Sequence, residues 1–193
     1  MGISETSVSE SSRSDHTVGA MVNDFSIRVA TVNGSGSQTS NLVLLRALFH
    51  MGIPVTGKNI FPSNIQGMPS WYSIRCSRHG YLAYRQNAEV AVLMNPATLE
   101  KDLAEIPPNG VCFHPDSLEI EIVRDDLTYY PMPVKHLSRV GGSSRSLRNY
   151  LTNMVYVGVL AQTLDIEMDA IEAALDWQFG GRSKLVNVNL PVI

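Results

Sequence analysis

One stretch, from Ile27 to Gly52, constrains the fold of this chain more than any other; it reads IRVATVNGSGSQTSNLVLLRALFHMG. It begins with a β-branched, apolar run that is typical of a buried strand, which we expect over Phe25–Val32. A turn of small residues follows. Leucines then recur at a spacing near 3.6 residues, which predicts a helix over Gln38–Met51 that ends at Gly52. The order strand, glycine-containing turn and helix favours an α/β fold.

The turn itself resembles the corners that bind phosphate groups. Glycines without a Cβ, here Gly34 and Gly36, let the backbone approach a ligand closely. The unpaired N–H groups and the positive dipole end of the following helix then face an anion. The match to G-x-G-x-x-G is partial, because Thr39 stands where the third glycine would be. The alternative is a tight turn, capped by Ser37 or Thr39, that binds nothing.

The size and charge of the chain exclude several classes of protein. The 193 residues suit one domain, which we expect over 24–193, after a serine-rich and disordered tail over 1–23. The net charge of −3 gives no broad basic face, so we expect no nucleic-acid partner. No apolar run reaches the ~20 residues that span a bilayer.

Cysteine usage limits the metal chemistry of the chain. Cys76 and Cys112 lie far apart in the sequence, and C-x-x-C does not occur. Neither a four-thiolate iron–sulfur cluster nor a structural zinc site can therefore form from this chain alone. Two free thiols suit a reducing cytoplasm, and a disulfide between them is the less favoured alternative.

The rest of the chain continues the α/β pattern. Ile53–Thr56 begins a second strand, a long polar loop follows over 57–70, and Trp71–Cys76 is expected to form a β-hairpin with Tyr81–Tyr84. The further predicted strands are Ala88–Met94, Val111–Phe113, Leu118–Val123 and an edge segment over Leu127–Pro131. The further predicted helices are a short one over Pro96–Glu105, a long one over Leu147–Val159, whose Gly158 permits close packing, and one over Met168–Phe179. We therefore predict a Rossmann-like fold, with a mostly parallel sheet, a β-hairpin and helices on both faces.

Motifs for catalysis are absent. The histidines do not have metal-ligand spacing, and no nucleophile-plus-base set, G-x-S-x-G elbow or Walker A motif occurs. A dinucleotide site would place an acidic residue about 20 residues beyond the glycines. Lys58 lies near that place, which disfavours NAD and leaves an NADP-binding enzyme as one hypothesis. The residues by themselves indicate an α/β domain that binds a small anion.

Five segments in a fixed order carry a resemblance to a known family. They are IRVATVNGSGSQTSNLVLLRALFHMG, GKNIFPSNIQGMPSWYSIR, AVLMNPATLEKDLAEIPPNGVCF, NMVYVGVLAQTLDI and LVNVNL. Their combination resembles the gamma domain of 2-oxoacid:ferredoxin oxidoreductases, above all the one at the start of 2-oxoglutarate-type alpha subunits. The resemblance is compatible with an N-terminal domain of a longer subunit and with a separate gamma subunit.

The resemblance implies a role in a heteromeric complex. Such an enzyme converts a 2-oxoacid and CoA to acyl-CoA and CO2 and reduces ferredoxin. It implies that thiamine diphosphate and iron–sulfur clusters belong to partner domains or subunits, and that this domain contributes CoA binding and subunit contacts.

The resemblance also implies which residues bind CoA. They are Gly34, Ser35, Gly36, Ser37, Gln38 and Thr39 in the turn, Asn153 in the long helix, Asn189 near the end, and Asn64 and Gln66 in the polar loop. Pyruvate-type enzymes have a basic contact near 64–66, where this chain is neutral; Lys58 is expected to compensate. A scaffold domain without its own ligand is the other hypothesis, and its sign would be a glycine turn filled by neighbouring side chains.

Overall fold

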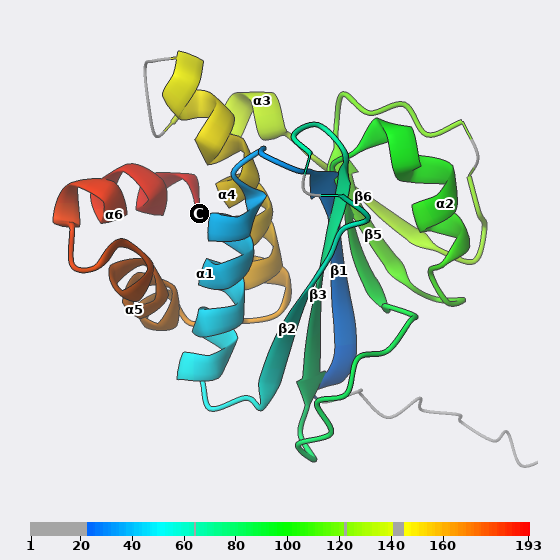
Figure 1. The fold of residues 1–193 in the computed structure, drawn as a ribbon, viewed down its shortest axis with the longest axis horizontal. Coiled ribbons are helices and arrows are strands. Elements are labelled where there is room, and N and C mark those ends of the chain that lie inside the picture. The colour runs from blue at the N-terminus through cyan, green and yellow to red at the C-terminus, as the bar shows by residue number, and fades with distance from the viewer. Residues whose placement is uncertain (1–22, 64, 122, 141–144) are drawn as a thin grey trace, which may run out of the picture.

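The computed structural model describes residues 23–63, 65–121, 123–140 and 145–193 (Figure 1). The predicted tail over 1–23 therefore lies outside the described residues, except for Asn23. In chain order the elements are β1 (Asp24–Val32), α1 (Ser37–His50), β2 (Val55–Ile60), β3 (Pro69–Ser77), β4 (Val90–Leu93), η1 (Pro96–Thr98), α2 (Leu99–Ala104), β5 (Val111–Pro115), β6 (Thr128–Met132), α3 (Val134–Leu137), α4 (Arg145–Thr163), α5 (Met168–Phe179), α6 (Ser183–Asn189) and η2 (Leu190–Val192).

The sheet has six strands in the order β2-β3-β1-β4-β5-β6. β1, β4, β5 and β6 are parallel neighbours, whereas β3 is antiparallel to both β1 and β2. β2 consequently runs in the same direction as β1, and β3 is the one reversed strand of this sheet. The predicted α/β fold with a mostly parallel sheet is confirmed. β6 lies at the edge of the sheet, as predicted for the segment around 127–131.

The hairpin forms from a different pair of strands than the pattern predicted. β3 pairs with β2, from Val55 opposite Cys76 to Ile60 opposite Trp71, while residues 81–84 form no strand. The prediction was wrong because Gly57 weakens the strand signal of β2. At Gly57 a Cβ would lie 2.1 Å from the Tyr72 hydroxyl oxygen, so glycine is what lets β2 continue beside β3. The loop between the two strands is therefore only 61–68.

The strand predicted over Leu118–Val123 was also wrong. Its described residues form no strand, and β6 pairs directly with β5. The alternation in this segment has another cause, because Ile120 packs against an apolar cluster around α2 and Leu118 lines a groove beside that helix. An irregular segment with one apolar side can thus show the same two-residue alternation of apolar and polar residues as a strand.

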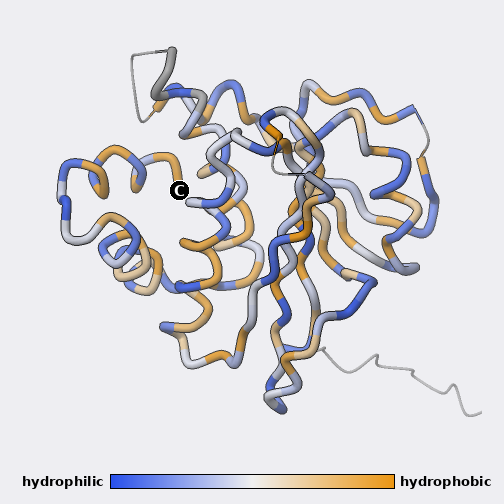
Figure 2. The backbone as a smooth tube through the Cα atoms, viewed as in Figure 1, coloured by the Kyte–Doolittle hydropathy of each residue, from blue (hydrophilic) through white to orange (hydrophobic). Residues whose placement is uncertain are grey.

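Helices cover both faces of the sheet, as predicted. On one face the core includes Ile27, Val29 and Ile74 of the strands, Leu44 of α1 and Leu175 of α5, none of them exposed. Figure 2 shows apolar residues along the helices on this side of the sheet. On the second face α2 covers β4 and β5 through a smaller apolar cluster. Cys76 belongs to the first cluster and Cys112 to the second, and both are buried free thiols.

Gly158 of α4 permits close packing, as predicted. A Cβ at this position would lie 2.3 Å from the carbonyl oxygen of Ile193 and 2.8 Å from its Cα. The chain after α6 therefore passes directly against the backbone of α4. In the described part of the chain, no helix is long and apolar enough to cross a membrane.

Candidate functional site

The predicted glycine turn connects the carboxyl end of β1 to α1, at the end of the sheet where parallel α/β folds bind ligands. Gly34 and Gly36 have φ angles of +83° and +84°, in the left-handed region that favours glycine. Gly36 is the N-cap of α1. Both glycines are thus required by the shape of the turn, and the second one sets the direction in which the helix begins.

A side chain of α4 binds the backbone of the turn. The side-chain amide of Asn153 donates a hydrogen bond of 2.8 Å to the carbonyl oxygen of Ser35. The hydroxyl of Ser37 lies 2.9 Å from that of Thr31, and both side chains are buried. Asn153 is itself only 4% exposed. Its amide therefore fixes the backbone of the turn.

The loop between β2 and β3 holds the turn from the other side. The backbone N–H of Asn33 donates to the carbonyl of Met68 over 2.8 Å, and the N–H of Gly67 donates to the carbonyl of Asn33 over 2.9 Å. The side chain of Asn33 also donates to the carbonyl of Ile65 over 3.2 Å. The turn and the hairpin loop are consequently one hydrogen-bonded unit.

Some polar groups in this unit have no hydrogen-bond partner within the described part of the chain. No side chain caps the first turn of α1, and that turn contains no acidic residue. The hydroxyl of Ser35 is buried and has no hydrogen-bond partner among the described residues. A hydroxyl without a partner beside uncapped helix N–H groups is a set of donors that fits an anion such as a phosphate. The cap expected from Ser37 or Thr39 does not form, because no described side chain caps α1 and the Ser37 hydroxyl contacts Thr31 instead.

Two side chains lie over the glycines. A Cβ at Gly34 would lie 2.8 Å from Cγ of Gln66, and a Cβ at Gly36 would lie 2.8 Å from Cδ1 of Tyr150. Tyr150 is 62% exposed. Sequence reasoning missed Tyr150, although it lies three residues before Asn153 and hence on the same face of α4. A ligand at the turn would contact or displace both side chains.

A pocket of about 210 Å³ opens beside Gly36, between α1, α4 and α6. Its lining is mostly apolar and consists of Gly36, Thr39, Tyr150, Leu151, Met154, Phe179, Leu185 and Asn189. The amide of Asn189 donates to the carbonyl of Leu185 over 2.8 Å within α6. Two predicted residues, Thr39 and Asn189, thus meet at one pocket although they are 150 positions apart.

The structure brings most of the predicted residues together. Gln66 lies against the turn at Gly34 and Asn153 binds it at Ser35, whereas Gln38 is exposed on the first turn of α1. Asn64 lies outside the described residues.

Lys58 is placed elsewhere. Its Nζ lies 4.5 Å from the centre of the Tyr84 ring, and the register aligns it with Ser73 and Arg28 on the face of the sheet opposite α1. The expectation that Lys58 compensates for a missing basic contact at the turn is wrong.

A buried titratable group of α4 has a structural role behind the turn. Tyr156 of α4 is fully buried, which raises the pKa of its phenol. The protonated hydroxyl donates to Oδ1 of Asn41 over 2.8 Å. Within the described residues, no group of three His, Cys, Asp or Glu could hold a metal ion. The donors that the structure describes at the turn are backbone N–H, hydroxyl and amide groups, all of them neutral.

Sequence comparisons place most of the chain within one family. The family model for pyruvate ferredoxin/flavodoxin oxidoreductase matches residues 26–193. The alpha subunit of 2-oxoacid:ferredoxin oxidoreductase 2 from Aeropyrum pernix is 18% identical over 215 aligned residues, which cover 88% of this chain and 33% of that protein. The chain thus spans about a third of the length of this curated relative.

Solved structures with the same fold include three oxidoreductases or their subunits. The 2-oxoglutarate:ferredoxin oxidoreductase from Magnetococcus marinus, with 2-oxoglutarate, coenzyme A and succinyl-CoA bound, matches with a TM-score of 0.66 and 23% identity, over 88% of this chain and 30% of that one. The keto/oxoacid ferredoxin oxidoreductase gamma subunit from Geobacter sulfurreducens matches with a TM-score of 0.66 and 14% identity. The match covers 86% of this chain and 94% of that one. A pyruvate oxidoreductase subunit from Thermotoga maritima matches with a TM-score of 0.64 and 16% identity. The match covers 89% of this chain and 93% of that one.

Proposed function

Because the chain belongs to the pyruvate ferredoxin/flavodoxin oxidoreductase family, we propose that it is the gamma domain of a 2-oxoacid:ferredoxin oxidoreductase and that its glycine turn binds CoA. The complete enzyme would convert a 2-oxoacid and CoA to acyl-CoA and CO2 and reduce ferredoxin. The 2-oxoglutarate type is the variant we favour, and a relative with this fold has CoA and succinyl-CoA bound.

The observation that carries this proposal is the set of unused donors at the turn. The N–H groups of the first turn of α1 have no side-chain cap, and the buried hydroxyl of Ser35 has no partner among the described residues. A phosphate of CoA would accept hydrogen bonds from these groups, and the helix dipole would favour its charge. Asn153 would keep the Ser35 peptide in place, and Gln66 would add a neutral amide.

The redox chemistry belongs to partners in this proposal. Two cysteines, each buried in a different apolar cluster, do not suit an iron–sulfur cluster in this chain. We infer that thiamine-diphosphate-binding domains or subunits and ferredoxin are the partners of the complex. The two free thiols favour a reducing cytoplasm as its location.

A specific observation supports a second candidate, a scaffold domain that binds no ligand by itself. Gln66 and Tyr150 already occupy the space above Gly34 and Gly36. In that case these side chains would be a permanent filling of the turn and not a cover that a ligand displaces. The NADP-binding hypothesis loses its support, because Lys58, the residue that favoured it, lies on the other face of the sheet.

Calorimetric titration of the chain with CoA, with NADPH as the matched nucleotide control, separates these candidates. We expect saturable heat with CoA and none with NADPH. If the chain binds neither, the scaffold candidate is favoured. If it binds NADPH alone, the proposal is contradicted.

A further inference from the structure

The second face of the sheet has two halves of different chemistry. Over β4 and β5 it is apolar and covered by α2. Over β1, β3 and β2 it is polar, because the register aligns Arg28, Ser73 and Lys58 in one row across the three strands. Arg28 and Ser73 are nevertheless 7% and 3% exposed. Burying polar side chains costs free energy of folding unless each has a hydrogen-bond partner. The partners of these side chains therefore indicate the role of this half of the face.

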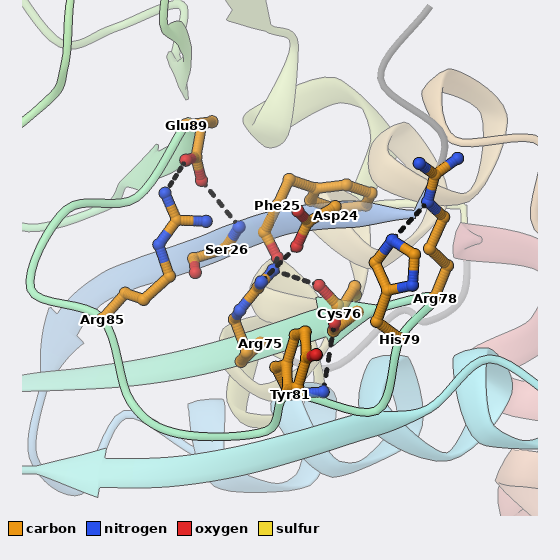
Figure 3. A network of polar contacts seen from close by, with 11 residues as sticks. Asp24, Phe25, Ser26, Arg75, Cys76, Arg78, His79, Tyr81, Arg85 and Glu89 are labelled. Carbon is orange, nitrogen blue, oxygen red and sulfur yellow. Dashed lines mark hydrogen bonds and ion pairs between the residues drawn. The ribbon is translucent and has the colours of Figure 1, made fainter.

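An irregular segment, the strap (residues 78–89), covers this polar half between β3 and β4. It is tied down at both ends, as Figure 3 shows. Near its start the N–H of Tyr81 donates to the hydroxyl of Ser77 over 3.2 Å. Near its end Glu89 accepts from the N–H of Ser26 over 2.8 Å and from Arg85 over 2.7 Å. The middle of the strap therefore has a defined place beside the sheet.

A groove of about 250 Å³ lies between the strap and α2. It is lined by Arg28, Ile60, Trp71, Tyr84, Gln86, Lys101 and Glu105. The Arg28 guanidinium is paired with Glu105 and bonded to the Gln86 carbonyl, and it donates to the Tyr84 hydroxyl over 3.1 Å. Its Nε is buried without a partner among the described residues. A mostly buried cation with one unpaired donor thus lies in the wall of the groove.

Two lysines add positive charge at the groove, Lys101 in its lining and Lys58 against the lining residue Tyr84. Lys58 lies over the ring of Tyr84, and Nζ of Lys101 lies 4.9 Å from the centre of the Trp71 ring. In the described part of the chain, no carboxylate lies within 4.0 Å of either lysine. Asp102, beside the groove, already accepts from the Trp71 indole over 2.7 Å. The lining therefore holds two cations, Arg28 and Lys101, and one carboxylate, Glu105, while Lys58 and Asp102 lie beside it.

We propose that this groove binds a small carboxylate or phosphate ester, on the face of the sheet opposite α1. The two lysines would attract its negative charge, and Arg28 would donate to it in competition with Glu105. The flat rings of Trp71 and Tyr84 would contact the body of the ligand. The inference stands apart from CoA binding at the glycine turn, because the two sites share no residue.

The indole N–H of Trp71 provides a direct measurement. We would titrate the full chain with inorganic phosphate or with succinate at constant ionic strength, and follow the two indole signals by nitrogen-15 NMR. Trp177 of α5 is an internal reference, because it lies over Arg46 on the other side of the molecule. We expect a saturable shift of Trp71 and none of Trp177. Whichever probe produces the shift identifies the phosphate or the carboxylate as the ligand group.

Three variants test the role of the charges. K58Q/K101Q should weaken anion binding about tenfold, and E105Q should tighten it about threefold because it removes the competing carboxylate. K184Q, an exposed lysine of α6, is the matched control and should bind as the wild type does. The proposal is overturned if Trp71 responds saturably to neither probe, or if K184Q and K58Q/K101Q change the affinity equally.

Discussion

Asn153 shows at the scale of one residue how the site depends on a distant part of the chain. Its amide is 4% exposed and donates to Ser35 over 2.8 Å. We predict that N153A lowers the free energy of unfolding by about 1–3 kcal/mol, because it removes the hydrogen bond to the part-buried carbonyl of Ser35 and leaves a small void. Urea denaturation measures this. Asn87→Ala, at an exposed position of the strap, is the control and should change the stability little. Equal effects of the two variants would contradict the assigned role.

Asp102 carries a pH dependence that can be measured. It is 4% exposed, and burial raises the pKa of its carboxyl above the ordinary 3.8, against hydrogen bonds from Thr98 and Trp71 that lower it. The folded protein therefore holds this proton more tightly than the unfolded chain does. The unfolding free energy should fall as the pH rises from 3.8 through the raised folded pKa.

D102N lacks this proton, so its stability relative to the wild type should increase over the same rise in pH. The difference is about 1.4 kcal/mol for each unit by which folding raises the pKa. We would measure urea denaturation of both proteins at several pH values from about 3 to about 7. Parallel pH profiles of the two proteins would show that Asp102 is not responsible.

The residues of the turn could be predicted from the sequence, because a positive φ favours glycine and leaves a visible signature. Gly34, Gly36 and Asn153 occupy the expected places. Tyr150 could not be selected, because an aromatic residue on a helix is most often part of the core. Its exposure, which indicates otherwise, exists only in the folded protein.

At the scale of an element, Gly158 tests how α4 packs. A Cβ there would lie 2.3 Å from the backbone of Ile193, which has no flexible side chain that could move aside. We predict that G158A lowers the stability by about 1–3 kcal/mol, although alanine favours a helix by about 1 kcal/mol. Q162A, exposed on the same helix, is the control in the same thermal or urea denaturation series. A stabilised G158A would mean that the terminal segment is displaced at no cost.

Most strands and helices were predicted correctly, because their periods are local properties of the sequence. The pairing of β3 was not, since the partner of a strand is set by contacts that the local pattern does not contain. Gly57 illustrates this: it weakens the strand signal of β2, yet its missing side chain is what accommodates Tyr72 of β3. The alternation over 118–123 failed for the opposite reason, because α2, and not a strand, takes up its apolar side.

At the scale of the whole molecule, the sheet separates two sites. The glycine turn and its pocket lie with α1, α4 and α6, and the charged groove lies with α2 and the strap on the other face. The chain spans about a third of its curated relative. If CoA binds at the glycine turn, as proposed, we expect the partner domains to meet this fold at that end of the sheet, because CoA would have to reach them from there.

The measurement that tests CoA binding at the turn most directly compares the two glycines that flank α1. Gly36 and Gly52 flank the same helix and have φ angles of +84° and +76°, so alanine strains the backbone similarly at both. A Cβ at Gly36 meets Tyr150 at the site, whereas one at Gly52 meets nothing within 4 Å. In calorimetric titrations with CoA, G36A should bind at least about tenfold more weakly than the wild type, roughly 1.4 kcal/mol, and G52A should bind equally well. Equal affinities of the two variants would contradict CoA binding at this turn.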